Sequence, residues 1–130
     1  MTRINAGIQP SRLGDKHLLA EHREIKRIPN LVSQGRYNLE GQPEKFCLGP
    51  GHVKFFYDKL GYLLTRYQAL YHECKRRGFQ VQDWSGAWQG VPPSLMNDWI
   101  PEGWVTQRVE ERIRERGGFP EDKVQNNGSN

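Results

Sequence analysis

The sequence contains few of the residues that build covalent frameworks, metal sites or membrane spans. Only two of its 130 residues are cysteines, Cys47 and Cys74, and they form no CxxC pair. This content excludes a disulfide framework, and two unpaired thiols favour a reducing, intracellular compartment. No stretch approaches the roughly 20 apolar residues of a membrane span, and the first residues lack the apolar segment of a signal peptide. We therefore expect a soluble protein that acts where it is made and has no membrane partner.

The common motifs for cofactors and nucleophiles are also missing. The chain has no P-loop, no GxSxG elbow, no dinucleotide-binding glycine pattern and no Cys/His cluster with the spacing of a zinc site. The sequence thus predicts chemistry without a metal or a cofactor. Lys and Arg number 19 against 15 Asp and Glu, which gives a net charge of +4. This small excess permits a polyanionic partner such as nucleic acid but does not require one.

Hydrophobic periodicity predicts the fold. Apolar residues recur at three- and four-residue steps in three segments, which is typical of helices that bury one face. The expected helices run from about Asp15 towards Ile28, from His52 to Arg77 and from Pro101 to Arg116, with Pro29 interrupting the first. No strand pattern stands out. The predicted fold class is therefore all-α, a single compact domain of three main helices with long connecting loops.

The hydrophobic share of 35% is enough for one core in a chain of this length. Leu18, Ile25 and Ile28 share one face of the first expected helix, and Cys74 lies among apolar positions of the second. We expect the domain to span residues 1–121. The polar residues 122–130 are expected to form a disordered tail. A single small domain is expected to be a monomer.

Two residues could carry chemistry without a cofactor. The small side chain of Thr2 favours removal of Met1, which would leave a free threonine amine. An α-amine has a pKa of about 7.7 to 8.0 and is partly neutral near pH 7, so it can attack a sugar carbon and form an imine. Glu24 could stabilise that imine and remove a neighbouring proton. Taken alone, both also fit an ordinary N-terminus and a surface glutamate paired with Arg27.

Basic residues accompany these candidates. Several fall on one side of the first expected helix, and others lie near the N-terminus and on the third helix. Arginine offers a bidentate fork for phosphate, and such contacts supply affinity without sequence specificity. The candidate DNA-binding residues are Arg3, Lys16, His17, Arg23, Arg27, Arg108 and Arg112. The alternative is a solvated helix face, and His17 alone also fits a structural histidine.

Five short strings occur in an order that resembles one known family. The chain opens with MTRIN, continues with HLLAEHRE at residues 17–24 and carries LGPGHVKFFYDKL at residues 48–60. ECKRRGF at residues 73–79 and DWIP at residues 98–101 follow, and then the basic helix that ends at Arg116. Up to that residue the sequence resembles the pyrimidine-dimer DNA glycosylase/AP lyase family, the phage endonuclease V type of ultraviolet repair.

The resemblance implies an all-helical enzyme that acts without metal or cofactor on double-stranded DNA carrying cyclobutane pyrimidine dimers. The Thr2 amine would attack C1′ of the 5′ nucleoside, displace its base and form an imine, and β-elimination would then break the strand on the 3′ side. Glu24 matches the glutamate that stabilises the imine and assists proton removal. The candidate basic residues fall on positions of DNA contact, with Lys16 in place of the usual glutamine. The enzyme would work in the cytoplasm of a bacterial or phage-infected cell.

The sequence departs from the family after the third helix. The family's aromatic, basic C-terminal segment, which contributes to dimer recognition, is replaced here by Gly117, Gly118 and a polar end with one aromatic residue. Two alternatives therefore stand beside dimer excision. One is a glycosylase/lyase for another damaged or modified base, and the other is a noncatalytic DNA-binding module on the same scaffold. A metal-dependent nuclease is a third.

Overall fold

The computed structural model describes residues 2–122 and is built from helices. The three long ones are α1 (Asp15–Glu24), α4 (Leu60–Arg76) and α5 (Gly103–Glu115). The shorter elements are α2 (Arg27–Ser33), α3 (His52–Phe55) and the 3-10 turns η1 (Pro10–Arg12), η2 (Ser85–Trp88) and η3 (Pro93–Leu95). Within residues 2–122 there is no strand, and no helix is long and apolar enough to cross a membrane. The predicted all-α domain with three main helices is confirmed.

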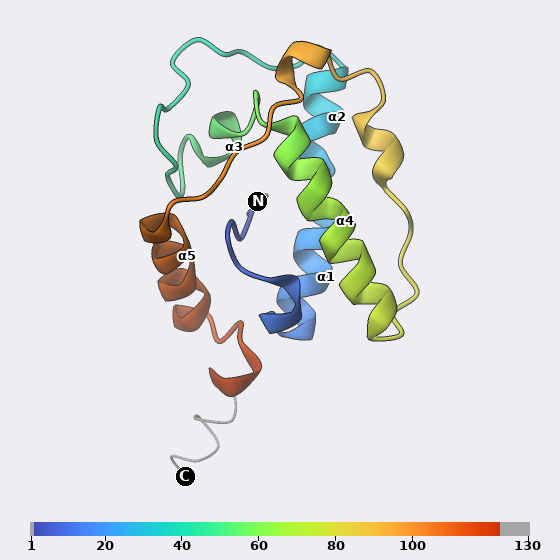
Figure 1. Ribbon diagram of the computed structural model, residues 1–130, viewed down its shortest axis with the longest axis vertical. Coiled ribbons are helices and arrows are strands. Elements are labelled where there is room, and N and C mark those ends of the chain that lie inside the picture. The colour runs from blue at the N-terminus through green and yellow to red at the C-terminus, as the bar shows by residue number, and fades with distance from the viewer. Residues whose placement is uncertain (1, 123–130) are drawn as a thin grey trace.

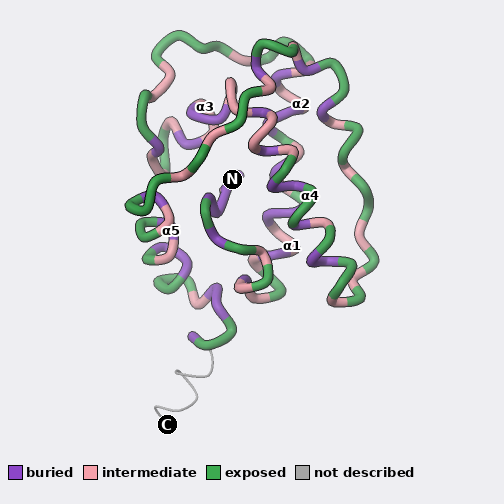
Figure 2. The backbone as a smooth tube through the Cα atoms, viewed as in Figure 1, coloured by how far each residue is buried: buried purple, intermediate pink, exposed green. Residues whose placement is uncertain are grey.

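The N-terminal segment occupies the middle of the molecule. Figure 1 shows α1 and α4 packed side by side, α5 on the opposite side, and the first residues running between them. Ile4, Ala6 and Ile8 of this segment are completely buried (Figure 2). The sequence analysis did not predict this burial, because a short non-helical segment has no helical periodicity to reveal it. The chain start is therefore part of the core.

The apolar faces predicted from the sequence do pack together. Leu18, Ile25 and Ile28 are completely buried, and so is Cys74. On α5 the buried apolar residues recur every four positions, at Val105, Val109 and Ile113. These faces enclose the N-terminal segment from both sides and hold it in place.

The first predicted helix is shorter than expected. It ends at Glu24, and α2 begins three residues later, at Arg27. The predicted interruption is present, but the break lies at residues 25–26, before Pro29, which is itself the third residue of α2. The first turn of a helix has no acceptor for its N–H groups, so a proline fits there without the loss of a hydrogen bond.

The second predicted helix is divided into α3 and α4. The break covers residues 56–59, where the segment before α5 supplies hydrogen bonds in place of a continuous helix. The Asn97 side chain donates to the Asp58 carbonyl at 2.8 Å, and the Asn97 carbonyl accepts from the Tyr62 N–H at 3.1 Å. These long-range contacts override a periodicity that continues through the break.

The chain after α5 folds back onto the domain. Phe119 is completely buried, with the guanidinium groups of Arg12 and Arg114 at 4.7 and 4.9 Å from its ring. Asp122 is buried and accepts hydrogen bonds from the Phe119 N–H and from Arg114. The tail predicted from residue 122 onward thus begins with an ordered residue, and residues 123–130 lie outside those described.

Gly61 allows the segment before α5 to cross the first turn of α4. A Cβ at Gly61 would lie 2.8 Å from the Met96 carbonyl oxygen and 3.1 Å from that of Asn97. Because both obstacles are backbone atoms, we expect Gly61→Ala to lower the free energy of unfolding by about 1–3 kcal/mol in urea denaturation. Gly86→Ala is the matched control, since nothing lies within 4 Å of that position. Equal stability of the two variants would contradict this explanation.

Candidate active site

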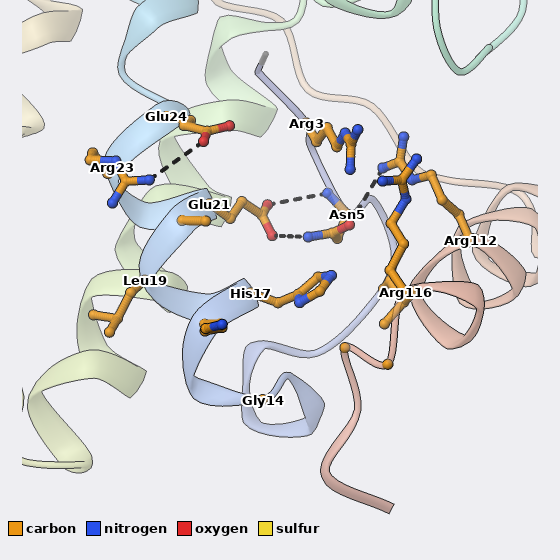
Figure 3. A pocket seen from close by; sticks show the side chains of 15 residues that line it. Arg3, Asn5, Gly14, His17, Leu19, Glu21, Arg23, Glu24, Arg112 and Arg116 are labelled. Carbon is orange, nitrogen blue, oxygen red and sulfur yellow. Dashed lines mark hydrogen bonds and ion pairs between the residues drawn. The ribbon is translucent and has the colours of Figure 1, made fainter. Parts of the chain in front are cut away.

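A pocket of about 760 Å³ opens between α1, the N-terminal segment and the end of α5 (Figure 3). The face of α1 that lines it carries His17, Glu21 and Glu24, which are spaced by four and three residues and so share one side of the helix. Arginines from the N-terminal segment and α5 line the opposite wall: Arg3, Arg112 and Arg116. The pocket therefore has a carboxylate side and a cationic side.

Glu21 ties the N-terminal segment to α1. Its side chain is 1% exposed and forms a bidentate ion pair with Arg66 of α4, with N–O distances of 2.5 and 2.9 Å. The same carboxylate accepts the Asn5 side-chain amide at 2.8 Å and the Asn5 backbone N–H at 3.3 Å. Arg66 also donates to the Ile8 carbonyl at 2.7 Å. One buried ion pair thus fixes the segment at two points.

Arg112 is the buried member of the cationic wall. It is 9% exposed, and its one hydrogen bond to a described residue is a long contact of 3.5 Å to the Asn5 side chain. Burial lowers the pKa of Arg112 to about 10, and the charges of Arg3 and Arg116 add to this shift. Within residues 2–122 no carboxylate forms an ion pair with any of these three arginines. The guanidinium groups of this wall are therefore available to bind an anion.

His17 lies between the two sides of the pocket. Burial, followed by the positive charges of the three arginines, lowers its pKa from the usual 6.5. The ring is therefore neutral at pH 7 and keeps one nitrogen that can accept a proton or a hydrogen bond. A neutral imidazole beside a cationic wall can orient a polar group of a bound sugar.

Glu24 is the second carboxylate of the α1 face. Its side chain is 16% exposed, and its ion pair is a loose one, 3.6 Å from Arg23. The alternative partner considered from the sequence, Arg27, lies on α2 and does not line the pocket. A partly exposed carboxylate with one weak partner remains available to a ligand in the pocket.

Gly117 and Gly118, which follow α5, line the end of the pocket near the start of α1. The Gly14 N–H donates to the Gly118 carbonyl at 2.8 Å, which joins the end of α5 to the start of α1. A Cβ at Gly118 would lie only 2.6 Å from the Nε2 atom of His17. Only glycine allows the backbone to pass this close to the imidazole.

The structure brings most of the predicted site residues together. The pocket is lined by Arg3, Lys16, His17, Arg23, Glu24 and Arg112. Arg27 and Arg108 do not line it; both are exposed, and Arg108 pairs with Glu111 at 3.5 Å. Thr2 is buried at the start of the segment and also does not line the pocket.

Sequence reasoning missed three residues of the site, Asn5, Glu21 and Arg116. Asn5 and Glu21 make the contacts that hold the segment, and their pairing joins positions too far apart in the chain for a local pattern to reveal it. Arg116 could have been found, because it continues the four-residue spacing of Arg108 and Arg112 on the same helix. In the described chain no three His, Cys, Asp or Glu side chains are grouped so that they could hold a metal ion.

A comparison with known protein families agrees with this geometry. The family model described as pyrimidine dimer DNA glycosylase matches residues 1–84. The matched range includes the N-terminal segment, α1 with its pocket face, and Arg66 of α4. The cationic wall contributed by α5 lies beyond the match.

The buried Glu21–Arg66 pair predicts a large effect on stability. Arg66→Met would leave the Glu21 carboxylate buried without its partner, so we expect a loss of about 3–5 kcal/mol in the free energy of unfolding. Adding Glu21→Gln should recover part of this loss, because the amide is uncharged and can still accept from Asn5. The exposed ion pair between Arg108 and Glu111 provides the control, and Arg108→Met should change the free energy of unfolding by less than about 1 kcal/mol. A loss in Arg66→Met no larger than the control's would show that the pair does not hold the fold.

Proposed function

The chain belongs to the pyrimidine dimer DNA glycosylase family, and on that premise we propose that it excises cyclobutane pyrimidine dimers with a coupled AP lyase activity. Membership makes it a DNA repair glycosylase whose substrate is DNA. The proposed nucleophile is the α-amine of Thr2 after removal of Met1. The proposed product is a strand broken on the 3′ side of the lesion.

The attachment of the N-terminal segment to the pocket face of α1 carries this proposal. Asn5 is held by Glu21, which lies one helical turn before Glu24. Asn5 lies three positions after Thr2, a distance of at most about 10 Å along an extended chain. The contact therefore keeps the chain start in the neighbourhood of the Glu24 carboxylate. Figure 3 shows the segment running past the side of α1 that carries these glutamates.

The proposed first step breaks the bond between the base and its sugar. The neutral Thr2 amine donates its electron pair to C1′, and the base leaves with the electron pair of the broken bond and takes up a proton. The nitrogen loses one proton, its electron pair forms the C1′–N double bond, and the C1′–O4′ bond breaks as O4′ takes up a proton, which gives a protonated imine on the opened sugar. The Glu24 carboxylate stabilises its positive charge.

The proposed second step breaks the strand. Glu24 removes a proton from C2′, the electron pair forms the C2′–C3′ double bond, and the 3′ phosphate leaves with the electrons of the C3′–O bond. Water then hydrolyses the imine and returns the free amine. The negative charge of the phosphate is balanced by the cationic wall of Arg3, Arg112 and Arg116.

The remaining basic residues, of which Lys16 and Arg23 line the pocket and Arg27 and Arg108 do not, are proposed to bind the phosphate backbone of the duplex. Lys16, Arg23, Arg27 and Arg108 are exposed. Such residues supply salt-dependent affinity for the phosphate backbone without reading its sequence. The neutral His17 is proposed to orient the sugar.

One observation favours a second candidate function, a glycosylase/lyase for another damaged base. Where the family carries an aromatic, basic segment, this chain folds Gly118 against His17. The wall that would contact the lesion is therefore altered, while the proposed nucleophile and Glu24 are unaffected.

Borohydride trapping tests the proposed chemistry. The protein should become covalently attached to abasic and to ultraviolet-irradiated duplexes, with EDTA having no effect. Glu24→Gln should slow cleavage of the abasic strand in the absence of borohydride by at least about 100-fold, because the variant lacks the acceptor for the C2′ proton. Glu40→Gln, at an exposed loop position, is the matched control and should cleave like wild type.

Each outcome of this experiment separates the candidates. Trapping on the abasic duplex alone would support the lyase chemistry and contradict dimer specificity. No trapping on either duplex would contradict an enzymatic function and favour the noncatalytic DNA-binding module. Cleavage that EDTA abolishes would favour the metal-dependent nuclease.

Arg112→Gln should change stability and DNA binding in opposite directions. Because the pKa of Arg112 is lowered to about 10 in the folded protein, its charge opposes folding at every pH below that value. We therefore expect a higher urea midpoint at pH 7 than in wild type. Duplex affinity should fall, and the slope of its logarithm against the logarithm of salt concentration should shrink by about 1.

The matched control for this variant is Arg76→Gln. Arg76 is exposed on α4, paired with Glu73, and does not line the pocket. Its salt slope should equal that of wild type. An Arg112→Gln variant that binds DNA with the wild-type salt slope would show that the cationic wall does not contact phosphate.

A further inference from the structure

The loop of residues 47–52, which contains the sequence GPGH, holds a histidine that the proposed chemistry does not use. His52 is 4% exposed and packs against the rings of Phe46 and Phe56, each 5.4 Å away and nearly perpendicular to the imidazole. It does not line the pocket. Yet both of its ring nitrogens have defined hydrogen-bond partners, and one of these partners belongs to the N-terminal segment.

The hydrogen bonds fix the tautomer of His52. The Ile4 backbone N–H donates to Nε2 at 2.9 Å, so Nε2 must carry a lone pair. Nδ1 lies 2.9 Å from the Cys47 carbonyl oxygen, which can only accept, so Nδ1 must carry the proton. Only the neutral ring with its proton on Nδ1 satisfies both partners. A protonated ring would place a second N–H against that of Ile4.

The surroundings keep this ring neutral. The pKa of His52 is lowered to about 4, chiefly by burial and also by the charges of Arg112 and Arg3, whereas the Cys47 carbonyl and Glu21 oppose the shift. The acceptor on Nε2 is therefore present at neutral pH.

Glycine makes the turn that brings the Cys47 carbonyl to the ring. Gly51 precedes α3 with a φ of +88°, a conformation that residues with a side chain rarely adopt. A Cβ there would also lie 3.0 Å from the Pro43 ring and 3.3 Å from the Cys47 sulfur. The loop thus holds the imidazole at Nδ1, through the Cys47 carbonyl, and leaves Nε2 facing the N-terminal segment.

We propose that His52 is a positioning residue for the nucleophile, and that its bond to the Ile4 N–H sets the place of the Thr2 amine. This inference rests on the proposed function of Thr2. Within residues 2–122 the bond to Ile4 is the hydrogen bond nearest to Thr2 along the segment. The two backbone nitrogens are two residues apart and so at most about 7 Å from each other. Glu21 anchors the neighbouring Asn5, and the two anchors together leave the chain start little freedom.

Two amide variants separate positioning from packing. In His52→Gln the amide oxygen reaches the place of Nε2 and still accepts from Ile4. In His52→Asn the shorter amide reaches only the place of Nδ1, so Ile4 loses its acceptor while the contact to Cys47 is kept. We expect the single-turnover rate of borohydride trapping on an abasic duplex to fall about tenfold or more in the Asn variant, because misplacement of reacting atoms by about 1 Å costs up to about 100-fold. The Gln variant should trap near the wild-type rate.

Duplex affinity distinguishes this role from a general loss of structure. Both variants should bind the duplex as tightly as wild type, and His72→Gln, at an exposed position of α4, should change neither quantity. Equal trapping rates for the Gln and Asn variants would overturn the proposal, and so would a parallel loss of rate and affinity in the Asn variant.

If neither variant folds, amide hydrogen exchange of the wild-type protein provides the test, since fast exchange of the Ile4 N–H would overturn the proposed anchoring by His52. A wild-type protein that does not trap would instead contradict the proposed function, while Ile4 exchange would still report on the His52 bond.

Discussion

The buried ion pair between Glu21 and Arg66 is the constraint on which the rest of the structure depends. It joins α1 to α4 and at the same time binds the N-terminal segment, because both partners use their remaining hydrogen-bonding capacity on Asn5 and Ile8. A buried charge without such partners would be very costly, so the segment and the pair stabilise each other. The chain start of most proteins is loosely held. Here it is fixed between helices, which is what a reaction at the N-terminus would require.

In the pocket, the stability of the fold and the binding of an anion make opposite demands on the arginines. Arg112 is buried beside Arg3 and Arg116 without a carboxylate among the described residues to balance them, and this arrangement weakens the fold. In the proposed function, a DNA phosphate would supply the missing anion when the substrate is bound. Burial, together with the same charges, lowers the pKa of His17 and keeps its ring neutral. The electrostatics of the pocket are therefore understandable only with a polyanion as the partner.

Much of this architecture could be predicted from the sequence, and the exceptions have physical reasons. The helical class, the buried faces of the long helices and six of the site residues follow from periodicity and from the resemblance to the family. The helix break at residues 56–59 could not be found, because long-range hydrogen bonds and not local propensity cause it. The burial of the N-terminal segment depends on Glu21, Arg66 and His52, which are 16 to 58 residues away from the groups they bind. Contacts of that kind leave no mark on local sequence.

The central claim is that the α-amine of Thr2, held in place by this network, forms the covalent bond to DNA. Lys16 also lines the pocket and offers a second amine, so the identity of the attached nitrogen is decisive. The direct measurement is peptide mapping by mass spectrometry of the protein after borohydride trapping on an abasic duplex. The account predicts that the nucleotide remnant is attached to the N-terminal peptide, on a Thr2 nitrogen from which Met1 has been removed. A remnant on Lys16, or a trapped protein that retains Met1, would contradict it.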